Sequence, residues 1–209
     1  VSERLGVTYW GSAYGSDSQK SGMVNASEEL QALGTKVIKL CANDVKNAYK
    51  FDSWGSYVSL ADILASDNFR GCFEMGLKTY VLVAYEQSNI RWQDGVSAAE
   101  QDKVEKQFYD AATYLLQTYK NTGKTFIFTN WEGDNMLAGD VSGNRVQGLI
   151  DYFNARQGGV DRARKELGMT TGCMVFNGVE INKVLSKTAN NVGKLLDIVI
   201  PFTNADIYS

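Results

Sequence analysis

Hydrophobic residues along the chain form six short continuous runs, and the segments between them carry hydrophobic positions at helical spacing. The run Tyr80-Val81-Leu82-Val83-Ala84 is typical of a parallel strand that is buried on both faces. The pattern predicts strands at residues 5–10, 35–42, 79–85, 125–129, 172–177 and 197–202. Strands that alternate with helices indicate an α/β fold with a parallel sheet and right-handed crossovers.

The helical segments carry recognisable start signals. Asn25 is the expected N-cap of the first helix, and Ser97 with Glu100 matches a capping box. Residues 144–167 predict a long helix, which we expect to be interrupted at Gly158-Gly159 because glycine is a poor helix former.

Two architectures fit this alternation, an open doubly wound sheet and a (β/α)8 barrel of the TIM type. In a doubly wound sheet the site residues gather at the one point where the strand order reverses. Here polar residues follow nearly every predicted strand, which favours the barrel. Eight units need about 250 residues, whereas this chain of 209 residues supplies six. We therefore predict a single domain over residues 1–209, a truncated or incomplete barrel. Its open strand edges would allow self-association.

Composition narrows the classes of function. A net charge of −3 and a pI of about 5.1 argue against a nucleic-acid or anionic membrane surface. No apolar run approaches the roughly 20 residues that span a bilayer. The chain opens directly into a strand-like segment, so we expect a mature or excised domain that works outside the cytoplasm, extracellular or periplasmic.

Histidine is absent, which excludes Ser-His-Asp and Cys-His catalysis and most zinc hydrolases. General acid–base chemistry would then fall to carboxylates or tyrosine. The three cysteines, Cys41, Cys72 and Cys173, form no C-x-x-C pair, and we expect them to be buried as small hydrophobic residues.

Polar and aromatic side chains follow the predicted strands, at the edge where a barrel places its site. Carboxylates in pairs are what glycosidic bond cleavage requires, and indole faces are surfaces on which sugars stack. This chemistry needs no cofactor and no metal. The candidates at this edge are Trp10, Asn43, Asp44, Glu86, Gln87, Asn130, Trp131, Glu132, Asp134, Glu180, Asn204 and Asp206.

Each candidate also has a purely structural interpretation. Asp44 and Asp134 could serve only as helix N-caps. The Asn177-Gly178 pair could start a turn that points Glu180 outward. Trp54 and Trp92 could simply cover the end of the barrel.

The segment Asn130-Trp131-Glu132 resembles the Asn-Glu end of strand four in the cellulase-like clan, a superfamily of (β/α)8 retaining glycoside hydrolases. The longer stretch Asn-Trp-Glu-Gly-Asp-Asn also resembles that of uncharacterised bacterial proteins with a glycosidase-type barrel, and residues 5–10 are similar to their first strand. The resemblance implies that Glu132 is the general acid/base. Two features depart from the pattern. Trp131 separates the asparagine from the glutamate, and the family's nucleophile ends a seventh strand that this chain does not show.

These observations predict a glycoside hydrolase-like domain whose partner is an oligo- or polysaccharide. Glu132 would donate the proton and later act as the base. We expect substrate to be bound by Trp10, Asn43, Glu86, Asn130, Trp131, Asp134, Asn204 and Asp206, and Glu86 or Asp206 would hold hydroxyls or supply the second carboxylate. Two alternatives remain open: a non-catalytic carbohydrate-binding barrel, and a barrel enzyme that holds a divalent cation with Glu86, Glu132 and Asp134.

Overall fold

The computed structural model describes residues 6–10, 20–43, 49, 57–139, 141–168, 172–183 and 195–209, which form an α/β fold. Its six-stranded sheet is parallel throughout, and the strands lie side by side in chain order. The predicted β-α alternation and parallel sheet are confirmed. The strands are β1 (Gly6–Thr8), β2 (Val37–Cys41), β3 (Thr79–Val83), β4 (Thr125–Thr129), β5 (Met174–Val179) and β6 (Ile207–Tyr208).

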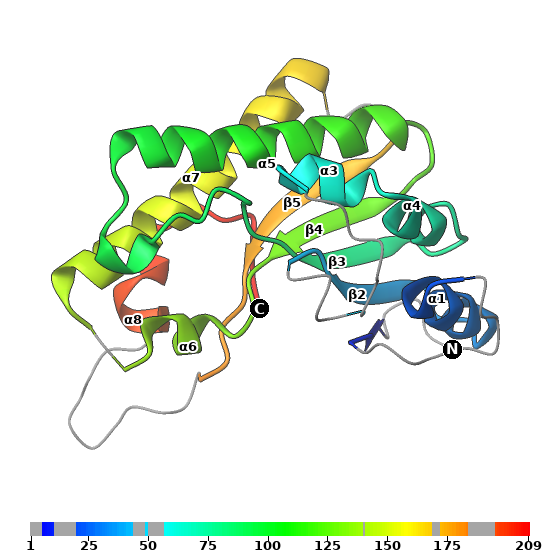
Figure 1. Ribbon diagram of the computed structural model, residues 1–209, viewed down its shortest axis with the longest axis horizontal. Coiled ribbons are helices and arrows are strands. Elements are labelled where there is room, and N and C mark those ends of the chain that lie inside the picture. Colours follow the sequence, from blue (N-terminus) through cyan, green and yellow to red (C-terminus); the bar gives the residue numbers. More distant parts are fainter. Residues whose placement is uncertain are drawn as a thin grey trace.

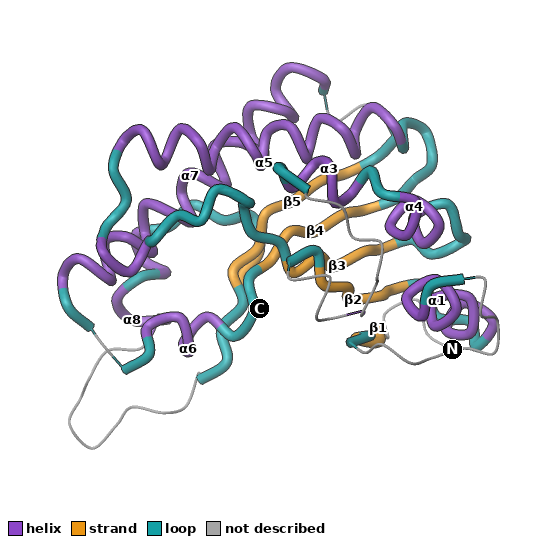
Figure 2. The backbone as a smooth tube through the Cα atoms, in the orientation of Figure 1, coloured by secondary structure: helices purple, strands orange, loops and turns teal. Residues whose placement is uncertain are grey.

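Helices cover one face of the sheet: in Figure 1 α3 and α5 lie above β3 and β4, α4 lies at the right-hand side of these strands, and α1 lies lower, beside β2. Figure 2 shows the strands in orange, with the C-terminus near the end of β5, which pairs with β6. The helices are α1 (Gly22–Ala32), α3 (Leu60–Leu64), α4 (Asp67–Phe73), α5 (Ala98–Thr118), α6 (Gly133–Leu137), α7 (Gly143–Leu167) and α8 (Leu195–Ile198), with short 3-10 turns η1 (Trp92–Asp94) and η3 (Ile200–Phe202).

The core lies between this helical layer and the sheet, because alternate strand residues point to opposite faces. Phe126 of β4 packs against Phe73 of α4, and Phe128 packs against Phe108 of α5. On the opposite face the residues in the first part of each of β2, β3 and β4 are only half-buried, whereas Cys41, Val83 and Thr129 at their C-terminal ends are buried. In the central row of this face Lys39, Val81, Ile127 and Phe176 are register partners on β2 to β5. Lys39 therefore stands on the less covered face. The three cysteines are buried as predicted.

The prediction of the sixth strand is wrong. Residues 197–202 form the end of α8 and the 3-10 turn η3, and β6 begins only at Ile207. Pro201 lies inside the predicted run, where it lacks the N–H that a central strand must donate. The structure places this proline at the start of η3, where that N–H is not needed.

Two helix predictions also need correction. Asn25 lies inside α1, and Ser21 is the N-cap, since its Oγ accepts a hydrogen bond from the Val24 N–H at 3.3 Å. Helix α7 runs without interruption through Gly158 and Gly159. The capping box of Ser97 and Glu100 on α5 is confirmed.

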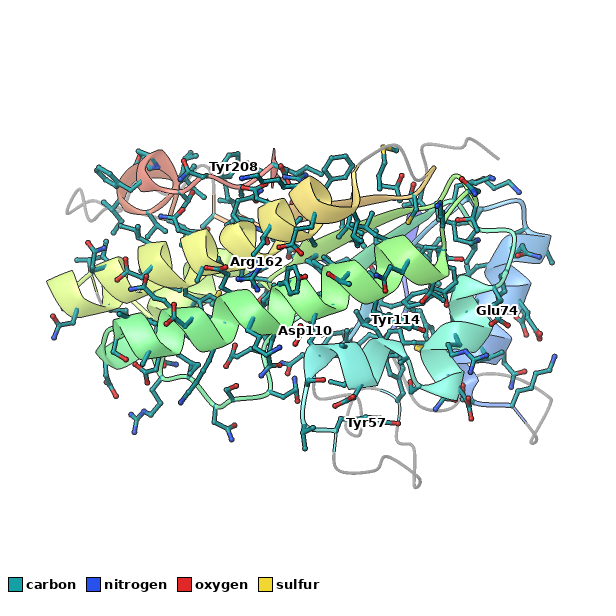
Figure 3. All side chains as sticks on the ribbon, turned by 90° about the horizontal axis from the view of Figure 1, so that it is seen from above. Tyr57, Glu74, Asp110, Tyr114, Arg162 and Tyr208 are labelled. Carbon is teal, nitrogen blue, oxygen red and sulfur yellow. The ribbon has the colours of Figure 1, made fainter. Side chains whose placement is uncertain are left out.

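Gly159 has a packing role that explains why the helix tolerates it. Helices α5 and α7 lie side by side, and Arg162, labelled in Figure 3, donates to the Glu105 carboxylate across their interface at 2.6 Å. A Cβ on Gly159 would lie 2.3 Å from the Glu105 carbonyl oxygen and 2.7 Å from the Tyr109 nitrogen. A Cβ on Gly158 would meet only the Glu105 carboxylate at 3.5 Å, an ordinary contact.

The two adjacent glycines should therefore respond in opposite ways to alanine. Gly159→Ala is expected to lower the free energy of unfolding by about 1–3 kcal/mol, because the clash is with backbone. Gly158→Ala should be neutral, or stabilising by up to about 1 kcal/mol, because alanine favours helix. Urea unfolding of both variants measures this, and equal effects at the two positions would contradict the packing described.

Candidate active site

The turn at residues 130–134 follows β4, and its backbone N–H groups donate hydrogen bonds to groups at the ends of neighbouring strands. The Trp131 N–H donates to the Tyr85 hydroxyl at 2.9 Å. The Glu132 N–H donates to Glu180 Oε1 at 3.3 Å, and the Gly133 N–H donates to the Glu180 carbonyl at 3.1 Å. Residues after β3 and β5 thus fix the conformation of the segment after β4.

Asn130 fastens the same turn to the segment after β5. Its side-chain amide donates to the Glu180 carbonyl at 3.1 Å and accepts from the Glu180 N–H at 2.9 Å. The side chain is fully buried. The structure therefore uses Asn130, predicted to bind a sugar hydroxyl, as an internal strand-to-strand connection.

Asp134 has a similar internal role. Its carboxylate accepts hydrogen bonds from the backbone N–H groups of Asn182, Lys183 and Leu195, at 3.0, 2.9 and 3.1 Å. The Asp134 N–H in turn donates to the Asn182 side chain at 2.9 Å. All of these contacts are with the chain after β5, so this predicted substrate-binding carboxylate is buried and committed to the fold.

Gly133 is required by close packing. A Cβ at this position would lie 2.2 Å from the Glu180 carbonyl oxygen and 2.5 Å from a Leu195 methyl carbon. Such distances leave no room for any side chain. Of the five turn residues, only Trp131 and Glu132 direct side chains away from this packed base.

Glu132 occupies a left-handed backbone conformation, with φ 42° and ψ 66°. This region is unfavourable for a residue with a side chain and persists only where surrounding contacts enforce it. The half-buried Glu132 carboxylate accepts a hydrogen bond from the Asn135 side chain. The hydrogen bonds of the turn therefore hold Glu132 in a strained but defined position.

Next to Glu132 lie four side chains from four different strand segments, which we call the rim cluster: Trp10, Lys39, Trp131 and Glu180. Lys39 forms an ion pair with Glu180, and both side chains are about four-fifths buried. The Lys39 ammonium also lies over the Trp131 ring, 5.1 Å from its centroid. The two indoles contact each other, with centroids 5.2 Å apart and ring planes tilted by 41°.

The indoles remain open to solvent. Trp10 is 50% exposed and Trp131 is 39% exposed. Exposed aromatic faces beside an ion pair can bind the apolar face of a polar molecule while the charged groups bind its hydroxyls. The rim cluster is therefore the strongest candidate site in the described part of the chain.

Lys39 and Tyr85 were missing from the predicted candidates, and Glu180 was a candidate at the strand edge but was not included among the expected substrate-binding residues. Lys39 could have been found, because it interrupts the apolar run Val37-Ile38-Lys39-Leu40-Cys41. Glu180 follows β5 much as Glu132 follows β4, and the expected outward turn at Asn177-Gly178 does not occur because β5 continues to Val179. Nothing in the sequence distinguishes Tyr85 from the other tyrosines.

Glu86 follows β3 but turns toward the helical layer and away from the rim cluster. Its carboxylate accepts from the Tyr152 hydroxyl on α7 at 2.7 Å and from the Ile90 N–H at 3.1 Å. The fully buried Arg156 is a further charge in its surroundings. Burial raises the pKa of Glu86, and the two hydrogen bonds only partly oppose that effect. Glu86, predicted to bind substrate, therefore has its hydrogen-bond partners on α7 and in the chain after β3.

The raised pKa of Glu86 predicts the sign of a pH effect. A carboxyl group with a raised pKa in the folded state stabilises the fold at low pH, and this contribution is lost as pH rises through the folded-state pKa. Glu86→Gln cannot ionise, so its melting temperature should improve relative to wild type between pH 4 and pH 8. Glu100→Gln is the matched control, since hydrogen bonds from Ser97 lower the pKa of Glu100 and predict the opposite trend. Parallel pH profiles for wild type and Glu86→Gln would contradict this.

The remaining predicted site residues lie elsewhere or have internal partners. Asp206 precedes β6, where it pairs with Arg164 of α7 at 2.9 and 3.0 Å and accepts from the Asn177 N–H at 2.9 Å. Asn204, exposed in the loop before β6, is bonded through its N–H to Asn154 on α7. Their placement at the rim depended on the wrong sixth strand.

Among the other candidates, Asn43 is half-buried just after β2, as predicted, and Gln87 turns inward to donate to the Tyr85 carbonyl. Trp92 packs beside α7, with Arg145 above its ring. Asp44 and Trp54 lie outside the described residues.

The divalent-cation alternative finds no support in the described residues. They contain no group of three or more aspartate, glutamate, cysteine or histidine side chains that could hold a metal ion. Its three proposed ligands face different partners: Glu86 faces Tyr152, Glu132 faces Asn135, and Asp134 faces backbone N–H groups.

Comparisons with protein families, with curated proteins and with solved structures found no match to this chain. The search for membrane-spanning helices, made over the described residues, found none that is long and apolar enough.

Proposed function

We propose that this domain binds carbohydrate at the rim cluster and cleaves a glycosidic bond there, with Glu132 and Glu180 as its carboxylate pair. The observation that carries the proposal is that two exposed indoles contact each other, from the ends of β1 and β4, beside a Glu180 carboxylate that accepts the Glu132 backbone N–H. Indole faces supply the stacking surface, and paired carboxylates supply the acid–base chemistry that glycoside hydrolysis needs.

A barrel-type curvature of the sheet is part of the proposal. Strand order follows chain order, as in a (β/α) barrel, without the reversal that defines a doubly wound sheet. The Lys39–Glu180 ion pair is a second support. It spans from β2 to the residue after β5, which is ~14 Å across a flat sheet at about 4.8 Å per strand. Two side chains on one face meet over such a distance when the sheet curls toward that face, as barrel strands do.

The two glutamates suit different roles. Glu132 is half-buried, without a cation partner among the described ion pairs, and would protonate the leaving oxygen. Glu180 faces the Lys39 ammonium, which balances its negative charge. The Glu180 carboxylate would stabilise positive charge at the sugar or attack the sugar directly.

Hydrolysis of a panel of 4-nitrophenyl glycosides tests the proposal. We expect wild type to cleave at least one member, and Glu132→Gln to lose at least about 100-fold in rate, as is usual when a general acid is removed. The control, Glu28→Gln, alters an exposed carboxylate paired with Lys20 and should keep full activity. Full turnover by Glu132→Gln would overturn the role of this residue. Absence of both turnover and oligosaccharide binding in wild type would overturn the proposal.

A second candidate function, carbohydrate binding without catalysis, is favoured by one observation. Both carboxylates have partners within the chain, Asn135 for Glu132 and Lys39 for Glu180. Binding of oligosaccharides to wild type without release of reducing sugar would select this function over hydrolysis.

A further inference from the structure

The Tyr85 hydroxyl connects the end of β3 to the aromatic part of the rim cluster. It accepts the hydrogen bond from the Trp131 N–H at 2.9 Å. The Tyr85 ring is partly buried and packs against the hydrophobic core, so the hydroxyl is anchored from below. Tyr85 thus joins the hydrophobic core to the backbone of a residue whose indole is exposed to solvent.

The backbone N–H groups of Trp131, Glu132 and Gly133 donate to different sides of the turn. The N–H groups of Glu132 and Gly133 both donate to Glu180, on the β5 side. The Trp131 N–H donates toward β3, through Tyr85, and so fixes the opposite side of the turn. The adjacent Glu132 is in the left-handed region, and such a conformation persists only where its surroundings enforce it.

The Tyr85 phenol stays protonated and neutral over the neutral pH range. Burial raises the pKa of its phenol, opposed in part by the Trp131 N–H hydrogen bond and by the charge of Arg156. The hydroxyl therefore acts as a neutral acceptor for the Trp131 N–H over the neutral range. Replacing tyrosine with phenylalanine removes this acceptor and leaves the ring in place.

We infer that Tyr85 is a positioning residue of the proposed sugar site: its hydroxyl fixes the Trp131 backbone and so orients the indole against Trp10 and Lys39. The inference rests on the proposed function, and it assigns Tyr85 no direct contact with the sugar. A misplaced binding surface loses affinity although all its groups are present.

Tyr85→Phe tests this, with Tyr80→Phe as the matched control. Tyr80 is a buried tyrosine of β3 whose hydroxyl donates to the Cys72 carbonyl at 2.9 Å, on the helical side of the sheet. Both variants lose one tyrosine hydroxyl that makes a hydrogen bond. Two quantities are measured: the hydrogen-exchange rate of the Trp131 amide by NMR, and the affinity for cellotetraose, xylotetraose, mannotetraose and chitotetraose by tryptophan fluorescence.

We expect Tyr85→Phe to exchange the Trp131 amide faster and to bind the preferred tetrasaccharide about tenfold more weakly, the equivalent of one lost hydrogen bond. Tyr80→Phe should leave both quantities unchanged even if its melting temperature falls. Unchanged exchange, unchanged affinity in Tyr85→Phe, or an equal loss of affinity in Tyr80→Phe would each overturn the inference while leaving the proposed function intact. A wild type that binds none of the four sugars and cleaves no glycoside overturns the function and the inference together.

Discussion

An Asp134→Asn variant is expected to melt roughly 6 to 12 °C below wild type. The Asp134 carboxylate accepts three backbone hydrogen bonds, from Asn182, Lys183 and Leu195, and is buried. The amide nitrogen of asparagine must face at least one of these N–H groups, which leaves buried donors without a partner. The cost is about 3 kcal/mol, and 1 kcal/mol corresponds to about 2–4 °C in a domain of this size.

Asp151→Asn is the matched control. Asp151 lies on α7, where its carboxylate accepts a hydrogen bond from the Gln147 side chain in an exposed pair. The Asp151→Asn variant should therefore melt within about 2 °C of wild type. Thermal unfolding followed by circular dichroism compares the two. An Asp134→Asn variant that melts like wild type but fails to bind sugar would show that the carboxylate faces the ligand and not the chain after β5.

Removing the Trp131 indole should have the largest effect on ligand binding. Trp131→Ala is expected to weaken oligosaccharide binding by about 10- to 100-fold, since the variant loses the stacking surface and its contact with Trp10. Stability should change little, because the side chain is exposed and most of its contacts are within the rim cluster. Isothermal titration with the preferred tetrasaccharide measures the effect.

Phe202→Ala provides the control for loss of an exposed aromatic ring. Phe202 is 64% exposed in η3, away from the rim cluster, and its removal should leave affinity unchanged. Equal losses of affinity in the two variants would indicate a general surface effect. Unchanged affinity in Trp131→Ala would remove Trp131 from the site.

The sequence predicted β4 to the residue because its signals are local. Residues 125–129 are apolar, β-prone and followed at once by polar residues, and the strand has these bounds. The sixth strand failed because residues 197–202 are equally apolar but contain Pro201 and pack as short helical turns. Apolar character alone does not separate a buried strand from a buried turn, and the proline was the decisive signal.

The candidate site could be located from the sequence, but the role of each of its residues could not. The segment at residues 130–134 was correctly identified as unusual, but its residues divide into two roles that the sequence does not separate. Asn130, Gly133 and Asp134 build the turn, and Trp131 and Glu132 are presented by it. The roles depend on Glu180 and Asn182, which lie about 50 residues further along the chain. Contacts between residues so far apart in the chain leave no periodic pattern of hydrophobic residues in the sequence.

The central claim, that Trp10 and Trp131 form the face of a sugar site, is tested most directly by NMR of the tryptophan side chains. Each of the four tryptophans gives an indole N–H signal, and Trp92, packed beside α7, serves as an internal reference. On addition of a binding tetrasaccharide, the Trp10 and Trp131 signals should shift together and saturably, while the Trp92 signal stays in place. Saturable binding that leaves the Trp10 and Trp131 signals unmoved would contradict the claim.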